Sequence, residues 1–519
     1  MIHRHKLNIW FFILPPVLAS AILVSPAVRS SEVAKRPNIV LIMADDMGFS
    51  DAGCFGGEIN TPSIDSLAVN GIRFTQFYNC ARCVPTRASL LTGLYPQQAD
   101  GRHSVTLAQV LKKAGYRTLM TGKWHGYSEM PTKRGFDRYY GVISGSCNFF
   151  NPGDQRPGEP APAMDYGVIR PFAIDGRVFT PYTPQDKDWY ATDAFTEKAL
   201  EYLDKYAGDE RPFFLYISYT APHHPLQAPK DEIAKYRGNY MMGWEVLRQR
   251  RWKRMRELGI PEDNWRLSTR DAEAPAWESV ENKEESDLAM AVYAAMVDRM
   301  DQNIGRVLRK IHELGKEENT LVLFLSDNGA CAEINNQTPD IPPGPMNSYR
   351  TYDVAWANAG STPFRKFKRW THEGGICTPL IIMWPRVIKA GTMCRAPGHV
   401  MDLMPTFCEL AGEDYPQQWK GQDVIPCEGK SLVPLLRGGD RQPHDLLCWE
   451  HIGNKSVRKG KWKLVGHGDP AELSNWELFD LEADRTEVND LAKQNPLRVE
   501  WLANAWRDWA RRTGWRPTN

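Results

Sequence analysis

The sequence predicts an α/β protein with a large, mostly parallel central sheet flanked by helices, and a smaller C-terminal subdomain of antiparallel strands and one helix. Apolar, strand-like runs alternate with helical patterns through most of the chain, which is typical of parallel sheets covered on both faces. Two of these runs, NIVLIMADD and TLVLFLSDNG, end in polar residues. From about residue 440 the pattern changes to short strands separated by turns, followed by the amphipathic helix PLRVEWLANAWRDWARRTG.

Length and charge limit the classes of function. A chain of 519 residues with 42% hydrophobic content can bury a large core, and beyond about 300 residues a core usually splits into more than one domain. The formal net charge is +1, so bulk charge does not indicate binding to nucleic acid or to an anionic membrane. The basic run RQRRWKRMREL lies in a charged insertion, residues 235–285, with acidic flanks. We interpret it as a solvated helix face rather than a nucleic-acid site.

The N-terminal segment has a different character from the rest of the chain. A basic stretch over residues 3–6 precedes a mostly apolar stretch over 9–24, with small residues after it, which is typical of a secretory signal. We predict a signal peptide over 1–30, a catalytic domain over 31–438 and a C-terminal subdomain over 439–519. The protein would then be exported, to the periplasm or the medium, with no stable membrane span after cleavage. A membrane anchor is the alternative, although three prolines interrupt the apolar stretch.

Polar residues follow the predicted strands in chain order. Asp45 and Asp46 follow the first run. The helical pattern TLAQVLKKAG comes next, and the runs YRTLMTGKWH and PFFLYISYTAPHHP then bring Lys123 and His125, and His223 and His224. Asp327 and Asn328 end a later run. Ligands bind beyond the carboxyl ends of the strands in such sheets, so we expect these side chains to gather along one edge.

The polar pairs at the ends of two strands indicate a metal site. Four oxygen-bearing side chains, those of Asp45, Asp46, Asp327 and Asn328, favour a hard cation such as calcium or magnesium over zinc. Adjacent carboxylates repel each other unless positive charge lies between them. For either pair alone, the alternative is a helix N-cap or a turn after a strand.

The stretch CVPTRASLLTGLYP places a cysteine where a helix begins. Pro85 favours the first helical position, and Gly93 ends the helix. Cys83 would lie at the helix N-terminus, where backbone N–H groups favour negative charge, with Arg87 one turn further on. Such a position can hold an anion or an activated nucleophile. Ten cysteines in an exported chain permit disulfides, but setting Cys83 aside leaves nine, so at least one other thiol would be free.

The segment FRKFKRWTHEGG adds Lys368 to the candidates. Taken alone, this lysine is expected to be a solvated surface residue, because Arg365, Lys366 and Arg369 surround it. A basic loop facing an anion site would have the same sequence pattern. The order of residues does not separate these two interpretations.

Together these residues resemble the type I, formylglycine-dependent sulfatases, an arylsulfatase-like family of the alkaline-phosphatase-like superfamily. The motif C-x-P-x-R is met by Cys83, Pro85 and Arg87 and continues into ASLLTGLYP. The segments NIVLIMADDMG, TGKWH, APHHPLQAP, SDNGA and FRKFKRWTHEGG follow in the order of the family. The His-x-Pro-Leu pattern selects His223 and leaves His224 as a variable position. Position 86 is threonine where the motif often has serine, which keeps the hydroxyl.

The resemblance implies a formylglycine made from Cys83 by a formylglycine-generating or equivalent enzyme. One hydroxyl of the hydrated aldehyde would attack sulfur, and the second would then release sulfate from a covalent intermediate. The ligands of calcium, or alternatively magnesium, would be Asp45, Asp46, residue 83, Asp327 and Asn328. The remaining implied roles are charge stabilisation by Lys123 and Lys368, orientation of residue 83 by Arg87, a base at His125 and a proton donor at His223.

The implied activity is hydrolysis of aryl or carbohydrate sulfate esters, with a sulfated small molecule or glycan as substrate. A phosphonate or phosphodiester hydrolase of the same superfamily and a non-catalytic sulfated-glycan binder are the alternatives. The irregular, proline-rich segment from Ser146 to Thr183 is where we expect loops that shape specificity. In the C-terminal subdomain, the tryptophans at 501, 506 and 509 are predicted to be core residues, and residues 449–451 are candidates for a wall of the pocket.

Overall fold

The computed structural model describes residue 1, residues 36–126 and residues 129–516. The signal peptide predicted over 1–30 therefore lies outside the described part of the chain, apart from its first residue. Among the described helices, none is long and apolar enough to cross a membrane.

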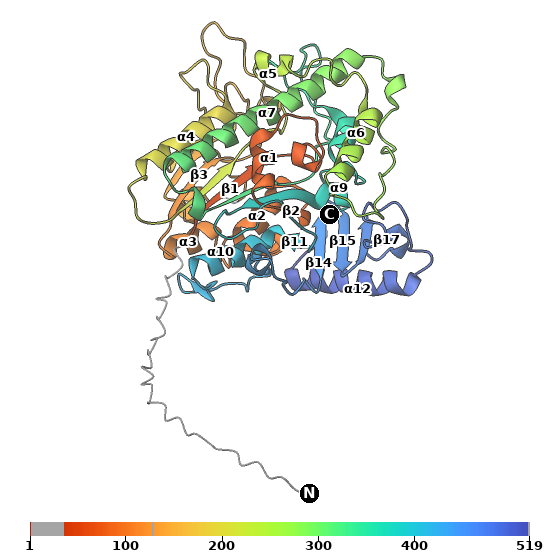
Figure 1. Ribbon diagram of the computed structural model, residues 1–519. Helices are drawn as coiled ribbons and strands as arrows, with labels where there is room; N and C mark the ends of the chain where they lie inside the picture. The colour runs from red at the N-terminus through yellow and green to blue at the C-terminus, as the bar shows by residue number, and fades with distance from the viewer. Residues whose placement is uncertain (2–35, 127–128, 517–519) are drawn as a thin grey trace, which may run out of the picture. The chain divides into compact units, whose positions relative to one another are not determined.

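A large mixed sheet forms the centre of the fold (Figure 1). In the described residues it has eleven strands in the order β10-β2-β9-β8-β1-β7-β3-β4-β5-β6, with β11 paired to β2. Their bounds are β1 (Asn38–Ala44), β2 (Ile72–Tyr78), β3 (Arg117–Gly122), β4 (Arg138–Val142), β5 (Phe172–Ile174), β6 (Arg177–Phe179), β7 (Phe213–Ser218), β8 (Thr320–Ser326), β9 (Cys377–Met383), β10 (Thr392–Cys394) and β11 (Gly398–His399).

The middle of the sheet is parallel, as the sequence predicts. Strands β8, β1, β7, β3 and β4 run in the same direction, with Leu41 of β1 opposite Leu323 of β8 and Tyr216 of β7. Strand β9 is antiparallel to both β2 and β8, and β5 and β6 are antiparallel at the other edge. The carboxyl ends of β1, β3, β7 and β8 therefore lie at the same edge of the sheet.

Helices cover both faces of the sheet (Figure 1). Strand β1 is buried along its whole length, and its alternating residues belong to two different hydrophobic clusters, with Val40 and Ile42 in one and Ile39 and Leu41 in the other. The first cluster contains residues of α1 (Pro62–Val69), α4 (Ala191–Lys205) and α7 (Lys283–Glu313). The second contains residues of α2 (Cys83–Thr92), α3 (Leu107–Lys113) and α10 (Leu403–Ala411). This two-sided burial explains why the central strands have continuous apolar sequences.

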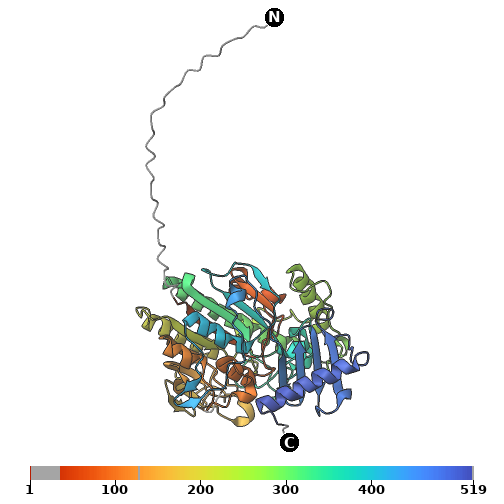
Figure 2. The same cartoon turned by 90° about the horizontal axis from the view of Figure 1, so that it is seen from below.

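The C-terminal part is an antiparallel sheet crossed by one helix (Figure 2). Its elements are β14 (Leu447–His451), β15 (Asn454–Lys459), β16 (Trp462–His467), β17 (Trp476–Asp480) and α12 (Pro496–Thr513). Trp506 is 1% exposed and donates its indole N–H to the carbonyl of Trp449 at 2.9 Å. Trp509 is also buried, but Trp501 is 50% exposed, so its assignment to the core is wrong. The boundary at residues 438 and 439 stays a prediction.

Buried charges join the two parts of the fold. Glu373, in α9 (Glu373–Ile376), accepts a hydrogen bond from Lys463 Nζ at 2.7 Å and another from Arg485. Burial alone would raise the pKa of Glu373, but the charges of Arg485 and Lys463 lower it to about 2. This carboxylate is therefore ionised inside the protein and tied to the C-terminal sheet region.

The charged insertion is only partly solvated. It begins directly after α5 (Lys230–Ala234) and contains α6 (Trp244–Glu257) and the start of α7. Arg250 is exposed, but Arg248 and Arg251 are buried, which corrects the interpretation of the whole basic run as a solvated face. Arg251 turns inward because acidic partners from the N-terminal part of the chain lie beneath α6. The remaining elements are α8 (Asp353–Gly360), α11 (Val433–Leu436), β12 (Gln418–Trp419) and β13 (Gln422–Asp423).

All ten cysteines lie in the described part of the chain, and each of them is unpaired. The expectation that at least one cysteine besides Cys83 is a free thiol is therefore met, and the other cysteines form no disulfide either. Nine of the ten are buried, the exception being the partly buried Cys427.

Candidate active site

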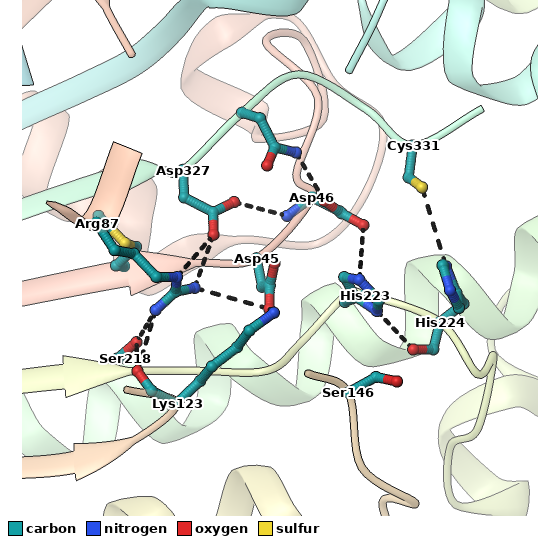
Figure 3. Close-up of polar contacts among 12 residues, drawn as sticks. Asp45, Asp46, Arg87, Lys123, Ser146, Ser218, His223, His224, Asp327 and Cys331 are labelled. Carbon is teal, nitrogen blue, oxygen red and sulfur yellow. Dashed lines mark hydrogen bonds and ion pairs between the residues drawn. The ribbon is translucent and has the colours of Figure 1, made fainter. Parts of the chain in front are cut away.

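The polar residues that follow the strands meet at one edge of the sheet, as predicted (Figure 3). Carboxylate oxygens of Asp45, Asp46 and Asp327 all lie within 4.8 Å of one another. Asp46 has a φ of 70°, and its backbone N–H donates to Asp327 Oδ1 at 3.2 Å. Asn328 Nδ2 donates to Asp46 Oδ1 at 2.6 Å. The alternative that these pairs are only caps or turn residues is wrong, because all four side chains form one buried cluster.

The cluster fits a hard divalent cation. Asp45 Oδ1 and Asn328 Oδ1 are both buried and have no hydrogen-bond partner among the described residues. Buried oxygens are nearly always paired, so two unpaired acceptors beside two further carboxylates form a donor set suited to a cation. Oxygen-only donors favour calcium or magnesium over zinc.

The pKa values within the cluster reflect crowded negative charge. Burial would raise the pKa of Asp45, but the charges of Lys123, His223 and Arg87 lower it to about 2. Burial and the neighbouring Asp45 carboxylate instead raise the pKa of Asp327 to about 7. Positive charge at this position would relieve the repulsion between them.

Three basic side chains surround the carboxylates. Lys123 Nζ donates to Asp45 Oδ2 at 2.6 Å, and Lys368 Nζ donates to Asp46 Oδ2 at 2.9 Å. Arg87 donates to Asp327 Oδ2 from Nε at 3.1 Å and from Nη2 at 2.7 Å. Lys368 is buried, so the alternative interpretation of Lys368 as a solvated surface lysine is wrong.

Arg87 connects three segments of the site through hydrogen bonds. Its Nη1 donates to the Lys123 carbonyl at 3.1 Å and to Ser218 Oγ, and Ser218 Oγ donates to the same carbonyl at 2.7 Å. Helix α2 is thereby fixed to the ends of β3, β7 and β8. Figure 3 shows Arg87 between Asp327 and Ser218. Sequence reasoning did not find Ser218, because nothing in the sequence distinguishes it from any other residue at the end of a strand.

Cys83 begins α2, two residues earlier than the start predicted from Pro85, and Gly93 ends the helix with a φ of 73°. The cysteine is 4% exposed, and burial raises the pKa of its thiol. It lines a cavity of about 350 Å³ together with Lys123, His125, His223 and Lys368. The predicted nucleophile, base, proton donor and two lysines therefore line one cavity beside the carboxylate cluster.

The histidines of this cavity are held neutral. Burial and the nearby Lys123 lower the pKa of His125 to about 2, and burial and His224 lower that of His223. His223 Nδ1 contacts the carbonyl of His224 at 2.6 Å, and its Nε2 lies 3.5 Å from Asp46 Oδ2. A neutral His125 suits a base. The donor role predicted for His223 requires negative charge of a bound substrate to raise its pKa.

His224 lines the cavity, as expected from its place after β7, although the sequence analysis gave it no role; its Nδ1 lies 3.9 Å from Cys331 Sγ. Several other residues of the cavity were missed by sequence reasoning. Glu333 lies 3.4 Å from Lys368 Nζ and 3.6 Å from Arg82. The other missed residues come from loops: Ser144, Gly145, Ser146, Asp165, Tyr166, Arg170 and Asn335.

Comparison with known proteins agrees with this geometry. The chain matches the sulfatase family over residues 37–413 and the C-terminal part of N-sulphoglucosamine sulphohydrolase over residues 364–499. An uncharacterized sulfatase of Schizosaccharomyces pombe is 34% identical, with 93% of this chain and 94% of that protein covered. The arylsulfatase of Klebsiella aerogenes is 32% identical, with 77% and 92% covered. The crystal structure of Ps i-CgsB in complex with k-i-k-neocarrahexaose has a TM-score of 0.65 at 26% identity, with 92% and 93% covered.

The chain therefore belongs to the sulfatase family, as the motifs around Cys83 predicted. The predicted fold class and the enzyme class, a sulfuric ester hydrolase, are confirmed with it.

Proposed function

We propose that this protein is an exported sulfatase that hydrolyses aryl or carbohydrate sulfate esters through a formylglycine made from Cys83, with a calcium ion beside it. The observation that carries the proposal is the shared cavity, in which Cys83 faces Lys123, Lys368 and two neutral histidines next to three carboxylates. The sequence around Cys83 supports recognition by a maturation enzyme, and the pattern of residues 1–30 supports export.

The residues that would hold the cation are Asp45, Asp46, Asp327, Asn328 and the side chain at position 83. When bound there, a divalent cation lowers the pKa of a coordinated hydroxyl and attracts sulfate oxygens. A hydrated formylglycine supplies two hydroxyls on one carbon, one for attack at sulfur and one for release of sulfate.

The chain's own side chains bind and orient the ester. Lys123 and Lys368 are buried, so their ammonium groups interact strongly with the charge that develops on sulfate oxygens. Neutral His125 can accept a proton, and Nε2 of His223 is the ring atom left to exchange a proton with the leaving oxygen. Arg87 holds the start of α2 against the carboxyl ends of β3, β7 and β8.

The experiment is peptide mass spectrometry on protein from a host that matures sulfatases, combined with turnover assays. We expect an aldehyde in place of the Cys83 thiol, and faster hydrolysis of an aryl sulfate than of the matched phosphodiester and phosphonate. The Cys83→Ala variant, made in the same host, is the matched control and should be inactive. Faster hydrolysis of the phosphorus esters would favour the phosphonate or phosphodiester hydrolase instead. An intact thiol in active protein would exclude the formylglycine.

A further inference from the structure

A short element of the irregular segment between Ser146 and Thr183 enters the active-site cavity. Asp165 and Tyr166, in the single turn Asp165–Gly167, and the nearby Arg170 line the same cavity as Cys83. None of these residues contacts the carboxylate cluster in the described structure. They are therefore placed to meet the part of a substrate that lies beyond its sulfate group.

Asp165 and Arg170 form a supported ion pair at this wall. Arg170 Nη2 donates to Asp165 Oδ2 at 2.7 Å, and both side chains keep part of their surface exposed. Asn335 Nδ2 and Gln337 Nε2 approach Asp165 Oδ1 at 3.3 Å each. The pair is thus fixed by a second loop and still has polar atoms available to a ligand.

A second pair of the same type lines the cavity. Glu333 lies 3.6 Å from Arg82 and 3.4 Å from Lys368. A carboxylate oxygen of Glu333 lies within 4.8 Å of a ring nitrogen of His224, and both residues line the same cavity as Asp165. Carboxylates in a cavity that receives an anionic ester oppose its binding. The carboxylates are compatible with binding of the ester when each is paired with a cation and its oxygens accept hydrogen bonds from neutral hydroxyls of the substrate.

Tyr166 presents an aromatic ring at the rim. Its side chain is 78% exposed, and its backbone has a φ of 49° and a ψ of 35°, which is rare for a bulky residue. The Tyr166 N–H donates to Gln337 Oε1 at 2.8 Å, which holds this conformation. Strained residues with exposed aromatic side chains are candidates for ligand contact. A tyrosine ring can pack against the C–H face of a sugar while its neighbours bind the hydroxyls.

We propose that Asp165, Tyr166 and Arg170 bind the sugar ring that carries the sulfate, so that the substrates are carbohydrate sulfates rather than aryl sulfates. The inference rests on the proposed sulfatase function and narrows its substrate class. Asp165 accepts hydrogen bonds from hydroxyls, Arg170 donates to hydroxyl or ring oxygens, and Tyr166 stacks on the ring. A hydroxyl both donates and accepts, so a paired carboxylate and guanidinium match neighbouring hydroxyls of a sugar.

The experiment measures kcat and KM of matured protein on a panel of monosulfated hexoses and on methylumbelliferyl sulfate. The variants are Asp165→Asn, Arg170→Gln, Tyr166→Ala and Tyr166→Phe, with Asp188→Asn as the matched control. Asp188 is exposed, follows the irregular segment in the chain and does not line the cavity. For the best hexose sulfate, we expect Asp165→Asn and Arg170→Gln to lower kcat/KM about tenfold or more, mainly through KM. On methylumbelliferyl sulfate, we expect the same variants to lose much less kcat/KM than they lose on the hexose sulfate. The Asp188→Asn variant should match the parent protein on both substrates.

Two further comparisons separate binding from support of the loop. Tyr166→Phe should keep the activity that Tyr166→Ala loses, because the phenyl ring still stacks. A deoxy analogue lacking the hydroxyl bound by Asp165 should be hydrolysed equally by the parent and Asp165→Asn proteins. Equal losses on hexose and aryl sulfates would overturn the inference, since the residues would then only hold the cavity. If the protein hydrolyses aryl sulfates but no hexose sulfate, the inference about the sugar is wrong and the proposed sulfatase function stands. If aldehyde-bearing protein hydrolyses no sulfate ester at all, the proposed function is wrong as well.

Discussion

Lys368 Nζ lies 2.9 Å from Asp46 Oδ2, although 322 positions separate the two residues in the chain. The neighbouring basic residues point elsewhere, since Arg365 pairs with Glu477 and Lys366 pairs with Asp271. One lysine of a basic segment is thus selected for the carboxylate cluster. Lys368 lies in the loop after α8, and its side chain places a positive charge at the end of β1.

Replacement of Lys368 by methionine should nearly abolish activity. We expect kcat/KM for an aryl sulfate to fall about 10²- to 10³-fold, because one buried ammonium that stabilises developing charge is removed. Steady-state kinetics on protein with verified conversion of Cys83 would measure this. Arg369→Met is the matched control, because Arg369 is the next residue and is exposed. Similar losses in both variants would contradict a specific role of Lys368.

Removal of divalent cations should destabilise the folded protein. A cation that binds only the folded state at a free concentration of 100 times its Kd adds about 2.7 kcal/mol to the free energy of unfolding. Calorimetry with chelator and after addition of calcium or magnesium would record a lower and then a restored Tm. The Asp327→Asn variant should respond weakly. Asp402→Asn, which changes a buried carboxylate paired with Arg441 outside the site, should keep the response. An unchanged Tm in the parent protein would argue against a cation at this cluster.

Arg251 and Arg250 are adjacent, but their replacement should have different effects. Arg251 is buried and donates from Nη1 to Asp51 Oδ1 at 2.6 Å and from Nε to Glu58 Oε2 at 2.7 Å. Arg251→Met removes the cation that pairs with these two carboxylates and should lower the free energy of unfolding by about 3–5 kcal/mol. Arg250→Met at the exposed neighbouring position should change it by less than about 0.5 kcal/mol. Urea denaturation distinguishes the variants, and equal midpoints would refute the buried role of Arg251.

The Glu373 cluster predicts a pH dependence of stability. The folded pKa of Glu373, about 2, lies below its ordinary value of 4.5. Its contribution is therefore fully present above pH 4.5 and is lost as the pH falls toward 2. Glu373→Gln should lower the free energy of unfolding by about 3 kcal/mol at neutral pH, and the difference from the parent protein should shrink below pH 4.5. Denaturation at several pH values would test this, with Glu482→Gln, at an exposed position three residues before Arg485, as the control. A difference that stays constant with pH would be inconsistent with ionised Glu373.

The sequence predicted the centre of the fold and most of the active site because both depend on local patterns. Continuous apolar runs identify buried parallel strands, and the ends of such strands share one edge. That rule alone predicted that Asp45, Lys123, His223 and Asp327 lie close together. Lys368 was different, since only the resemblance to a family separated it from a surface lysine.

The remaining features depend on contacts between distant parts of the chain. The basic run in α6 has no pattern that marks Arg251 as buried, because its partners Asp51 and Glu58 lie about 200 positions away. Trp501 and Trp506 lie on one amphipathic helix, and only the packing of α12 shows which of them is covered. Asp165 and Glu333 come from loops, whose course no periodicity predicts.

The attachment of Glu373 to Lys463 and Arg485 restricts how the protein can be shortened. Five positions separate this glutamate from Lys368, and its counter-charges come from the far end of the chain. A protein ending before β14 would keep Glu373 without the two cations that Lys463 and Arg485 supply. A shortened protein would therefore need a neutral residue or a new cation at position 373 to balance the charge that the C-terminal region now neutralises.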